Sequence, residues 1–215
     1  MADYQLHCFA QSGNAYKVAL ILALTGSSWE PVFVDFFNGE TRGARFRSDI
    51  NEMGEVPVLT FGGKKLTQSA AILTLLAERT GKFGGEDPDA RHEILRWMLF
   101  DNHKFTSYLA TYRFFNAFAK PLDPAVMDFL RGRVRAGLGI VEKHLAAQPF
   151  IVGTDATIAD FSLCGYLFYP ADEFGFDIAQ ENPAIGAWLA RIKALPGWVH
   201  PYDLMPGHPL PTRSA

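Results

Sequence analysis

Two short stretches of the sequence carry residues that could bind a small peptide. Val56 and Pro57 stand between a polar run and a β-branched segment, where a strand-opening proline fits a tight turn or a cis bond. Such a bond would turn the Val56 backbone outward and leave its N–H and C=O free. Gln68 and Ser69 start an apolar helix, whose free N–H groups and dipole favour a carboxylate. Together they predict a site for a small acidic peptide.

The elements that must position these residues are those of a compact α/β unit. The sequence predicts strands at 4–9 and 29–36, helices at 12–26, 44–49 and 69–79, and a hairpin with strands at 58–61 and 64–67. The hairpin follows from Gly62 and Gly63, a two-residue loop between strand-forming segments. This order of elements is typical of a thioredoxin-like domain, which we expect to span residues 1–83.

The remainder of the chain predicts an all-helical domain at residues 89–215. Residues 84–88, Gly-Gly-Glu-Asp-Pro, form the clearest linker. Helices are expected at 89–118, 124–147, 157–169 and 183–194, with a short one after Gly197. Because the tail from Pro201 also holds Pro206, Pro209 and Pro211, we expect it to be extended. The fold class is therefore α/β plus all-α.

The composition is that of a soluble globular protein. The 215 residues carry a net charge of −3, which predicts neither nucleic acid nor an anionic membrane surface as a partner. The sequence shows no apolar run of membrane-spanning length and no signal peptide. Cys8 and Cys164 stand in apolar settings, which favours free thiols in a reducing compartment, and we expect a cytoplasmic protein. The six histidines lack ligand spacing, so no metal site is expected.

Several motifs together carry a resemblance to a known family. The run V-P-V-L at 56–59, the glycine-bearing hairpin and T-Q-S-A-A-I-L at 67–73 resemble the glutathione-binding half of the cytosolic glutathione transferases. Thr157-x-x-Asp160 resembles the capping box that this family carries at the same place, where it helps folding. The likeness covers nearly the whole chain and is strongest in residues 1–83.

The resemblance implies a role for each residue of the two stretches. The backbone of Val56, before a cis Pro57, would pair with the cysteine of glutathione, and Gln68 with Ser69 would hold its γ-glutamyl end. Arg42 falls where relatives place a cation that faces the glycine carboxylate, a group that arginine binds bidentately. The alternative for Arg42 is a solvated loop arginine.

Glu55 departs from the family pattern, since many relatives carry Gln or Lys before Val-Pro. An acid there would repel the carboxylates of glutathione. We therefore expect Glu55 to point to solvent, to Arg42 or to Lys64.

Ser12 is the residue that the resemblance marks as catalytic, because serine-type members of the family keep an activating hydroxyl at this point. A free thiol has a pKa of about 8.5 and is mostly protonated at neutral pH. One hydrogen bond to the thiolate could supply about 1.5–3 kcal/mol towards its formation. Ser12 would act as a donor and not as a nucleophile. The alternative is a plain N-cap, and Asn14 and Tyr16 are further candidates for the donor.

The second substrate would need an apolar pocket. The helix expected at 89–118 carries an aromatic row at helical spacing, Phe105, Tyr108, Tyr112 and Phe115. We expect Tyr108 and Tyr112 to line that pocket. Such a row is also typical of a core or an interface.

The function implied is a glutathione transferase that uses glutathione as co-substrate, without a metal, and conjugates it to a small-molecule electrophile in detoxification. The alternatives are a glutathione-dependent reductase or isomerase, and a non-catalytic transferase-like binding module. Cys8 lies inside a strand, which argues against a mechanism that needs a protein thiol.

The helix expected at 89–118 also bears on how the chain assembles. The helix at 89–118 is apolar on more than one face, which favours a symmetric homodimer, as the resemblance also implies. Asp101 falls near an acidic residue that in relatives reaches the partner subunit's site. It would meet the α-amino group of glutathione there, and the alternative is an aspartate at the solvated rim of the helix.

Overall fold

The computed structural model describes residues 2–120 and 122–210. It divides into two compact units, one of residues 1–80 with 196–215 and one of residues 81–195. The first unit holds the predicted sheet and its helices, and the second is helical. The C-terminal segment from residue 196, expected in the helical domain, belongs to the first unit.

The first unit is built on a mixed sheet with the strand order β2-β1-β3-β4. Its strands are β1 (Tyr4–Cys8), β2 (Trp29–Phe33), β3 (Val58–Phe61) and β4 (Lys64–Thr67). β1 runs parallel to β2 and antiparallel to β3, which pairs with β4 across the predicted Gly62–Gly63 turn. Both turn glycines have positive φ, which is what a two-residue hairpin of this hand requires.

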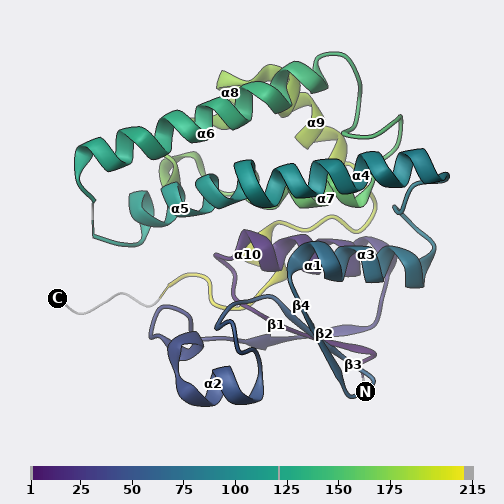
Figure 1. Ribbon diagram of the computed structural model, residues 1–215, viewed down its shortest axis with the longest axis vertical. Helices are drawn as coiled ribbons and strands as arrows, with labels where there is room; N and C mark the ends of the chain where they lie inside the picture. The colour runs from purple at the N-terminus through teal and green to yellow at the C-terminus, as the bar shows by residue number, and fades with distance from the viewer. Residues whose placement is uncertain (1, 121, 211–215) are drawn as a thin grey trace. The chain divides into compact units, whose positions relative to one another are not determined.

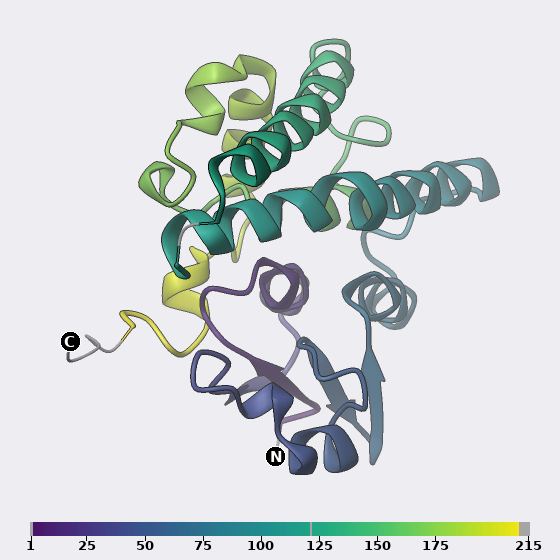
Figure 2. The ribbon, with the colours of Figure 1, turned by 60° about the vertical axis from the view of Figure 1, so that its left-hand side comes forward.

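Helices cover both faces of this sheet. Its helical elements are α1 (Gly13–Thr25), η1 (Glu40–Arg42), α2 (Ala44–Asp49), α3 (Ser69–Thr80) and α10 (Pro201–Leu204). Figure 2 shows α1 and α3 packed side by side on one face and α2 on the other. α1 ends at Gly26 in the left-handed conformation, as the sequence predicts. This layered arrangement confirms the thioredoxin-like domain.

The C-terminal segment corrects two expectations. Residues 201–204 form a helix, not an extended tail, because Pro201 occupies the first helical position and the His200 side chain caps the turn. The Tyr16 hydroxyl of α1 donates to the Val199 carbonyl at 2.9 Å. Such bonds place the segment in the first unit instead of the helical one.

The second unit consists of helices and turns throughout its described residues (Figure 1). Its helical elements are α4 (Pro88–Phe100), η2 (Asp101–Phe105), α5 (Thr106–Ala117), α6 (Pro124–Leu145), α7 (Ile158–Cys164), η3 (Ala171–Glu173), α8 (Ile178–Glu181) and α9 (Pro183–Lys193). The single helix expected at 89–118 is thus interrupted by η2, a π-helical turn. The helix expected at 157–169 ends early, at Cys164.

The predicted capping box opens α7 in the second unit. Asp160 is fully buried, and its carboxylate accepts hydrogen bonds from the N–H and hydroxyl of Thr157, at 2.8 and 3.0 Å. The same carboxylate accepts from the Ile151 N–H and from the Trp188 indole N–H, both at 2.8 Å. One side chain therefore joins α7, α9 and the loop before α7.

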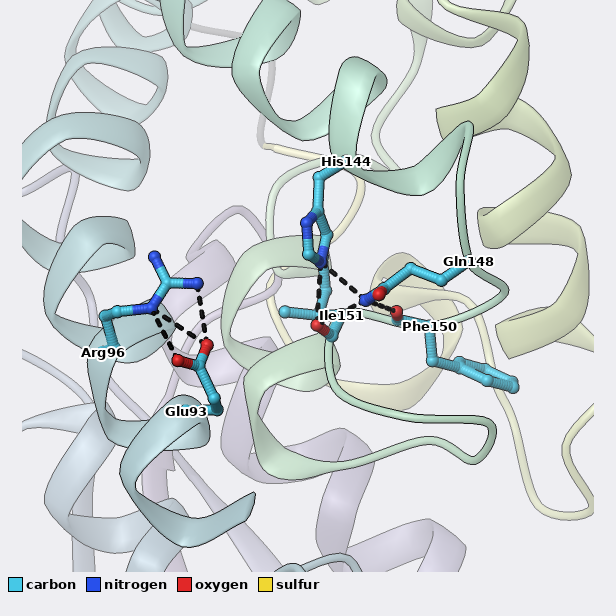
Figure 3. A network of polar contacts seen from close by, with 6 residues as sticks. All are labelled: Glu93, Arg96, His144, Gln148, Phe150 and Ile151. Atoms are coloured by element: carbon cyan, nitrogen blue, oxygen red, sulfur yellow. Dashed lines mark hydrogen bonds and ion pairs between the residues drawn. The ribbon is translucent and has the colours of Figure 1, made fainter. Parts of the chain in front are cut away.

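That loop is also held from α6, because Nε2 of His144 lies 2.9 Å from the Ile151 carbonyl oxygen. Gln148, which follows α6, adds further bonds. The Gln148 side-chain amide donates to the carbonyls of Phe150 and Ile151, at 2.7 and 2.9 Å, and lies beside the His144 ring (Figure 3).

On α4, Arg96 pairs with Glu93 at 2.7 Å, and this hydrogen bond lowers the pKa of Glu93. Both partners of the pair are exposed, so it contributes little to stability.

No helix in the described part of the chain is both long and apolar enough to cross a membrane.

Candidate active site

The register of the sheet gathers the predicted site residues of the first unit at one end. His7 of β1 pairs with Val58 of β3, and Val58 pairs with Thr67 of β4. The end of β1, the start of β3 and the end of β4 therefore lie at the same end of the sheet. Ser12 follows β1, Val56 and Pro57 precede β3, and Gln68 with Ser69 follow β4.

The Val56–Pro57 peptide bond is cis, as predicted. Neither the N–H nor the C=O of Val56 forms a hydrogen bond with any residue that the structure describes. Val56 is half-buried, whereas Pro57 is buried. A backbone donor and acceptor with the spacing of a strand are thus available to an extended ligand at this position.

Asn51 holds the loop before this bond. Its side-chain amide donates to the Glu55 carbonyl at 2.9 Å, and its side-chain oxygen accepts from the Met53 N–H at 3.1 Å. Gly54 has positive φ, and a side chain there would come within 2.8 Å of the Thr41 carbonyl oxygen. Asn51 was not among the residues expected in the site, although an Asn three residues before a Gly is a recognisable turn signal.

Gln68 adopts a left-handed backbone with φ of 68°, which is unusual for a residue other than glycine. Backbone strain of this kind persists only where the surrounding structure holds the residue in place, and it is common at ligand-binding sites. The exposed Gln68 amide is 3.3 Å from the Glu55 carboxylate and 3.3 Å from the Met53 sulfur. Glu55 is exposed, and its side-chain partner is Gln68, neither Arg42 nor Lys64.

Ser69 is the first residue of α3 and is buried. Its hydroxyl forms no hydrogen bond within residues 2–120 and 122–210. The first N–H groups of a helix have no partners within the helix and carry a partial positive charge. The hydroxyl and this helix end form a cradle suited to a carboxylate.

Ser12 is the N-cap of α1, which confirms that it caps this helix. Its side-chain oxygen accepts from the Ala15 N–H at 3.2 Å, and the residue is 5% exposed. The Ser12 hydroxyl donates to no residue that the structure describes. A hydroxyl that accepts a bond at its oxygen remains able to donate its hydrogen, and the accepted bond polarises it. Capping and donation to a ligand are therefore compatible.

Arg42 ends η1 and is exposed. Its guanidinium lies against Gly39, within about 3.2 Å of where a side chain there would begin. It makes no ion pair with the described residues. The packing of Thr41 on Gly54 connects this turn to the loop that precedes Val56.

The protein's own thiols are not placed for nucleophilic chemistry. Cys8 and Cys164 are buried and are not joined in a disulfide, as predicted. Burial raises the pKa of Cys8 to about 12, so this thiol stays protonated at neutral pH. In the described part of the chain, no group of His, Cys, Asp and Glu could hold a metal ion.

Two residues expected in the site belong to the core of the helical unit. Asp101 is 0% exposed and accepts hydrogen bonds from the hydroxyls of Thr106 and Ser162, both at 2.6 Å. A carboxylate enclosed in this way cannot reach a ligand of a partner subunit, so the contact expected of Asp101 is wrong.

Tyr112 is likewise 0% exposed, and its hydroxyl donates to the Phe174 carbonyl at 3.0 Å. The expectation that Tyr112 lines a substrate pocket is therefore wrong. Tyr108 is half-buried, lies near Phe129 and sits beneath the guanidinium of Arg133 at 4.9 Å.

The comparisons with known proteins agree with this arrangement. Residues 4–78 match the family model described as glutathione S-transferase, N-terminal domain, and residues 124–191 match glutathione S-transferase, C-terminal domain. The chain is 30% identical to glutathione S-transferase F14 of Arabidopsis thaliana, over 99% of this chain and 91% of that protein.

Solved structures give the same result. A glutathione S-transferase from Pseudomonas fluorescens Pf-5 superposes with a TM-score of 0.86 at 33% identity, covering 94% of this chain and all of that one. A family member from the same organism, described with two glutathione molecules bound, superposes with a TM-score of 0.78 at 25% identity, covering 90% and 89%. Sequence and fold together place this chain in the glutathione S-transferase family.

Proposed function

We propose that this protein binds glutathione at the shared end of β1, β3 and β4, and conjugates it to a small-molecule electrophile. The observation that carries the proposal is the set of unused polar groups at that end. They are the Ser12 hydroxyl, the Val56 backbone and the N-terminus of α3. A tripeptide with a thiol and two carboxylates matches these groups. The similar structure with two glutathione molecules bound supports the same ligand.

Each part of the ligand has a matching group. The Val56 N–H and C=O pair with the backbone of the cysteine, as an added strand does. Ser69 and the α3 N-terminus receive the γ-glutamyl carboxylate, with Gln68 beside them. Arg42 binds the glycine carboxylate, which suits a guanidinium that has no ion pair with the described residues.

The reaction needs the thiol of glutathione to lose its proton, which passes to solvent water. The Ser12 hydroxyl then donates a hydrogen bond to the sulfur and stabilises the thiolate. That thiolate attacks the electrophilic carbon, forms the C–S bond and displaces the leaving group with its electron pair. The protein supplies position and a lowered thiol pKa, and forms no covalent intermediate.

Asn14 is a second donor for the same sulfur. It lies in the first turn of α1, is half-buried, and its side-chain amide bonds to no residue in the described part of the chain. An amide N–H could share the thiolate with Ser12. Its contribution is separable by comparing Asn14→Ala with Ser12→Ala.

The two alternative functions differ in what they require. A reductase that uses a protein thiol is disfavoured, since Cys8 is buried with a pKa near 12. A non-catalytic binding module would need neither Ser12 nor Asn14 as free donors. Tyr108 remains the proposed contact of the electrophile. Two buried cysteines without a disulfide support a reducing, cytoplasmic compartment, and detoxification is the role that we propose for the conjugation.

Conjugation is tested with purified protein in two steps. Retention on immobilised glutathione, with elution by free glutathione, tests the binding site. Conjugation of a generic aryl halide then tests turnover. We expect both results. Turnover without retention would point to a different glutathione site, and retention without turnover would point to the binding module. Failure of both would overturn the proposal.

We further propose that the chain forms a symmetric homodimer through α4 and α6. Leu95 and Leu99 are exposed at i and i+4 on α4. Phe129 and Ile140 are exposed three turns apart on one face of α6. Large apolar side chains exposed on the surface of helices are typical of an interface.

Light scattering at micromolar protein is expected to give twice the chain mass. Phe129→Lys should shift the mass towards the monomer, because it buries a charge in the apolar contact. Thr154→Lys, in an exposed loop, serves as the control. A monomeric wild-type protein would contradict the dimer.

A further inference from the structure

Two carbonyls near the end of the described chain hold the loop that carries Ser12. The Ala10 N–H donates to the Pro206 carbonyl at 2.7 Å. The Gln11 side-chain amide donates to the Gly207 carbonyl at 2.9 Å, across 196 residues of sequence. Ala10 and Gln11 directly precede Ser12, and all three are buried. The loop is therefore fixed at two successive residues from one segment.

Residues 199–208, here called the C-terminal clamp, have their own attachments in the same unit. The Val199 carbonyl accepts from the Tyr16 hydroxyl on α1 at 2.9 Å. Gly207 packs so closely on Phe33 that a side chain there would begin 2.7 Å from its ring. The rings of Tyr202 and His208 stack at 3.7 Å and close the clamp on itself. The acceptors for Ala10 and Gln11 are thus held on a tethered segment.

Gln11 itself is 4% exposed. Burying an amide is costly unless it is hydrogen-bonded, and an apolar side chain would fill the same volume without that cost. The bond to Gly207 compensates part of it and couples the clamp to the residue before Ser12. The Ser12 N–H also donates to the Phe9 carbonyl at 3.0 Å, which makes the four residues one tight turn.

We propose that Gln11 is a positioning residue that sets the direction of the Ser12 hydroxyl through its bond to the C-terminal clamp. The inference rests on the proposed role of Ser12. A hydrogen bond weakens steeply as its angle departs from linear. A loop free to shift would therefore keep the Ser12 hydroxyl but spend less time in the geometry that stabilises the thiolate.

The test is the pH titration of glutathione bound to Gln11→Met, followed by the absorbance of the thiolate. Methionine keeps the length of the side chain and removes the donor. Below the titration midpoint, we expect about threefold less thiolate than in the wild type, as for partial loss of one hydrogen bond to a charged group. Binding of glutathione at low pH, where the thiol form dominates, should stay unchanged.

Two further variants make the result specific. A chain ended after Met205 removes both acceptor carbonyls and should raise the midpoint at least as far as Gln11→Met. Gln5→Met is the matched control. It removes an exposed side-chain hydrogen bond to Glu30 near the start of β1, whereas the Ser12 loop follows the end of that strand. It should titrate like the wild type.

The Ser12→Ala background separates positioning from a merely structural role. If Gln11 acts through Ser12, adding Gln11→Met to Ser12→Ala changes the midpoint no further. An unchanged midpoint in Gln11→Met, or an equal shift in the Ser12→Ala background, would overturn the inference while the proposed function stands. A wild-type protein that binds no thiolate would overturn both.

Discussion

Ser12→Ala is expected to lower kcat/KM for aryl-halide conjugation about 10- to 160-fold. A hydrogen bond to a charged acceptor contributes about 1.5–3 kcal/mol, and each 1.36 kcal/mol is a tenfold change in rate. The pH profile should move to higher pH, towards the free thiol pKa of about 8.5, because less thiolate forms at neutral pH. Affinity for glutathione should fall only a few-fold, since the backbone contact at Val56 remains.

Two other substitutions distinguish donation from capping. Ser12→Thr keeps both the cap and the donor, and should retain most activity. Ser12→Asp keeps a good helix cap but cannot donate when ionised and repels the thiolate. Its activity should therefore be as low as that of Ser12→Ala, with a more stable fold. Equal activity in Ser12→Asp and the wild type would show that Ser12 is a cap alone.

Asp160→Ala is expected to lower the free energy of unfolding of the helical unit by about 3–9 kcal/mol. It leaves the N–H groups of Ile151, Thr157 and Trp188 without their acceptor in the core, and each such loss costs about 1–3 kcal/mol. Burial raises the pKa of Asp160, and the four hydrogen bonds that it accepts oppose that rise. Denaturant unfolding followed by tryptophan fluorescence measures the change.

Asp155→Ala in the same loop is the matched control, because Asp155 is exposed and, among the described residues, its side chain hydrogen-bonds to Thr154 alone. It should change the unfolding midpoint little. Asp160→Asn keeps the shape of the side chain but presents an NH₂ group to an N–H or hydroxyl donor. Its unfolding midpoint should lie between those of Asp160→Ala and Asp155→Ala. A midpoint for Asp160→Ala equal to that of Asp155→Ala would remove Asp160 from its structural role.

The parts of the site that follow from local signals could be predicted. The two glycines at 62–63 fix a hairpin whatever surrounds them. Pro57 likewise predicts its own cis peptide bond, and the residues around Ser69 predict the start of a helix. Because pairing register then brings strand ends together, the shared end of β1, β3 and β4 follows from elements that the sequence defines.

The errors on the long helix had a readable cause. Asp101 lies on the same face as Ile94 and Phe105, at spacings of seven and four residues, and both of these side chains are buried. Tyr112 continues that face at seven residues beyond Phe105. The helical period thus places both residues in the core. The position of Asp101 relative to a family pattern placed it in the site, and the aromatic row at helical spacing placed Tyr112 there.

The C-terminal clamp could not be read from the sequence. Its bonds to Ala10 and Gln11 join residues nearly two hundred positions apart, and backbone carbonyls carry no side-chain signature. Proline content alone indicated an extended tail, yet Pro201 starts a helix because proline is well suited to a first helical position.

The most direct test of the account is the ultraviolet difference spectrum of glutathione bound to the wild-type protein, recorded across pH. The account predicts thiolate absorbance with a midpoint well below the free thiol pKa of about 8.5, and a return towards that value in Ser12→Ala. Glutathione that binds with its thiol titrating as it does in free solution would contradict the claim that this fold activates it.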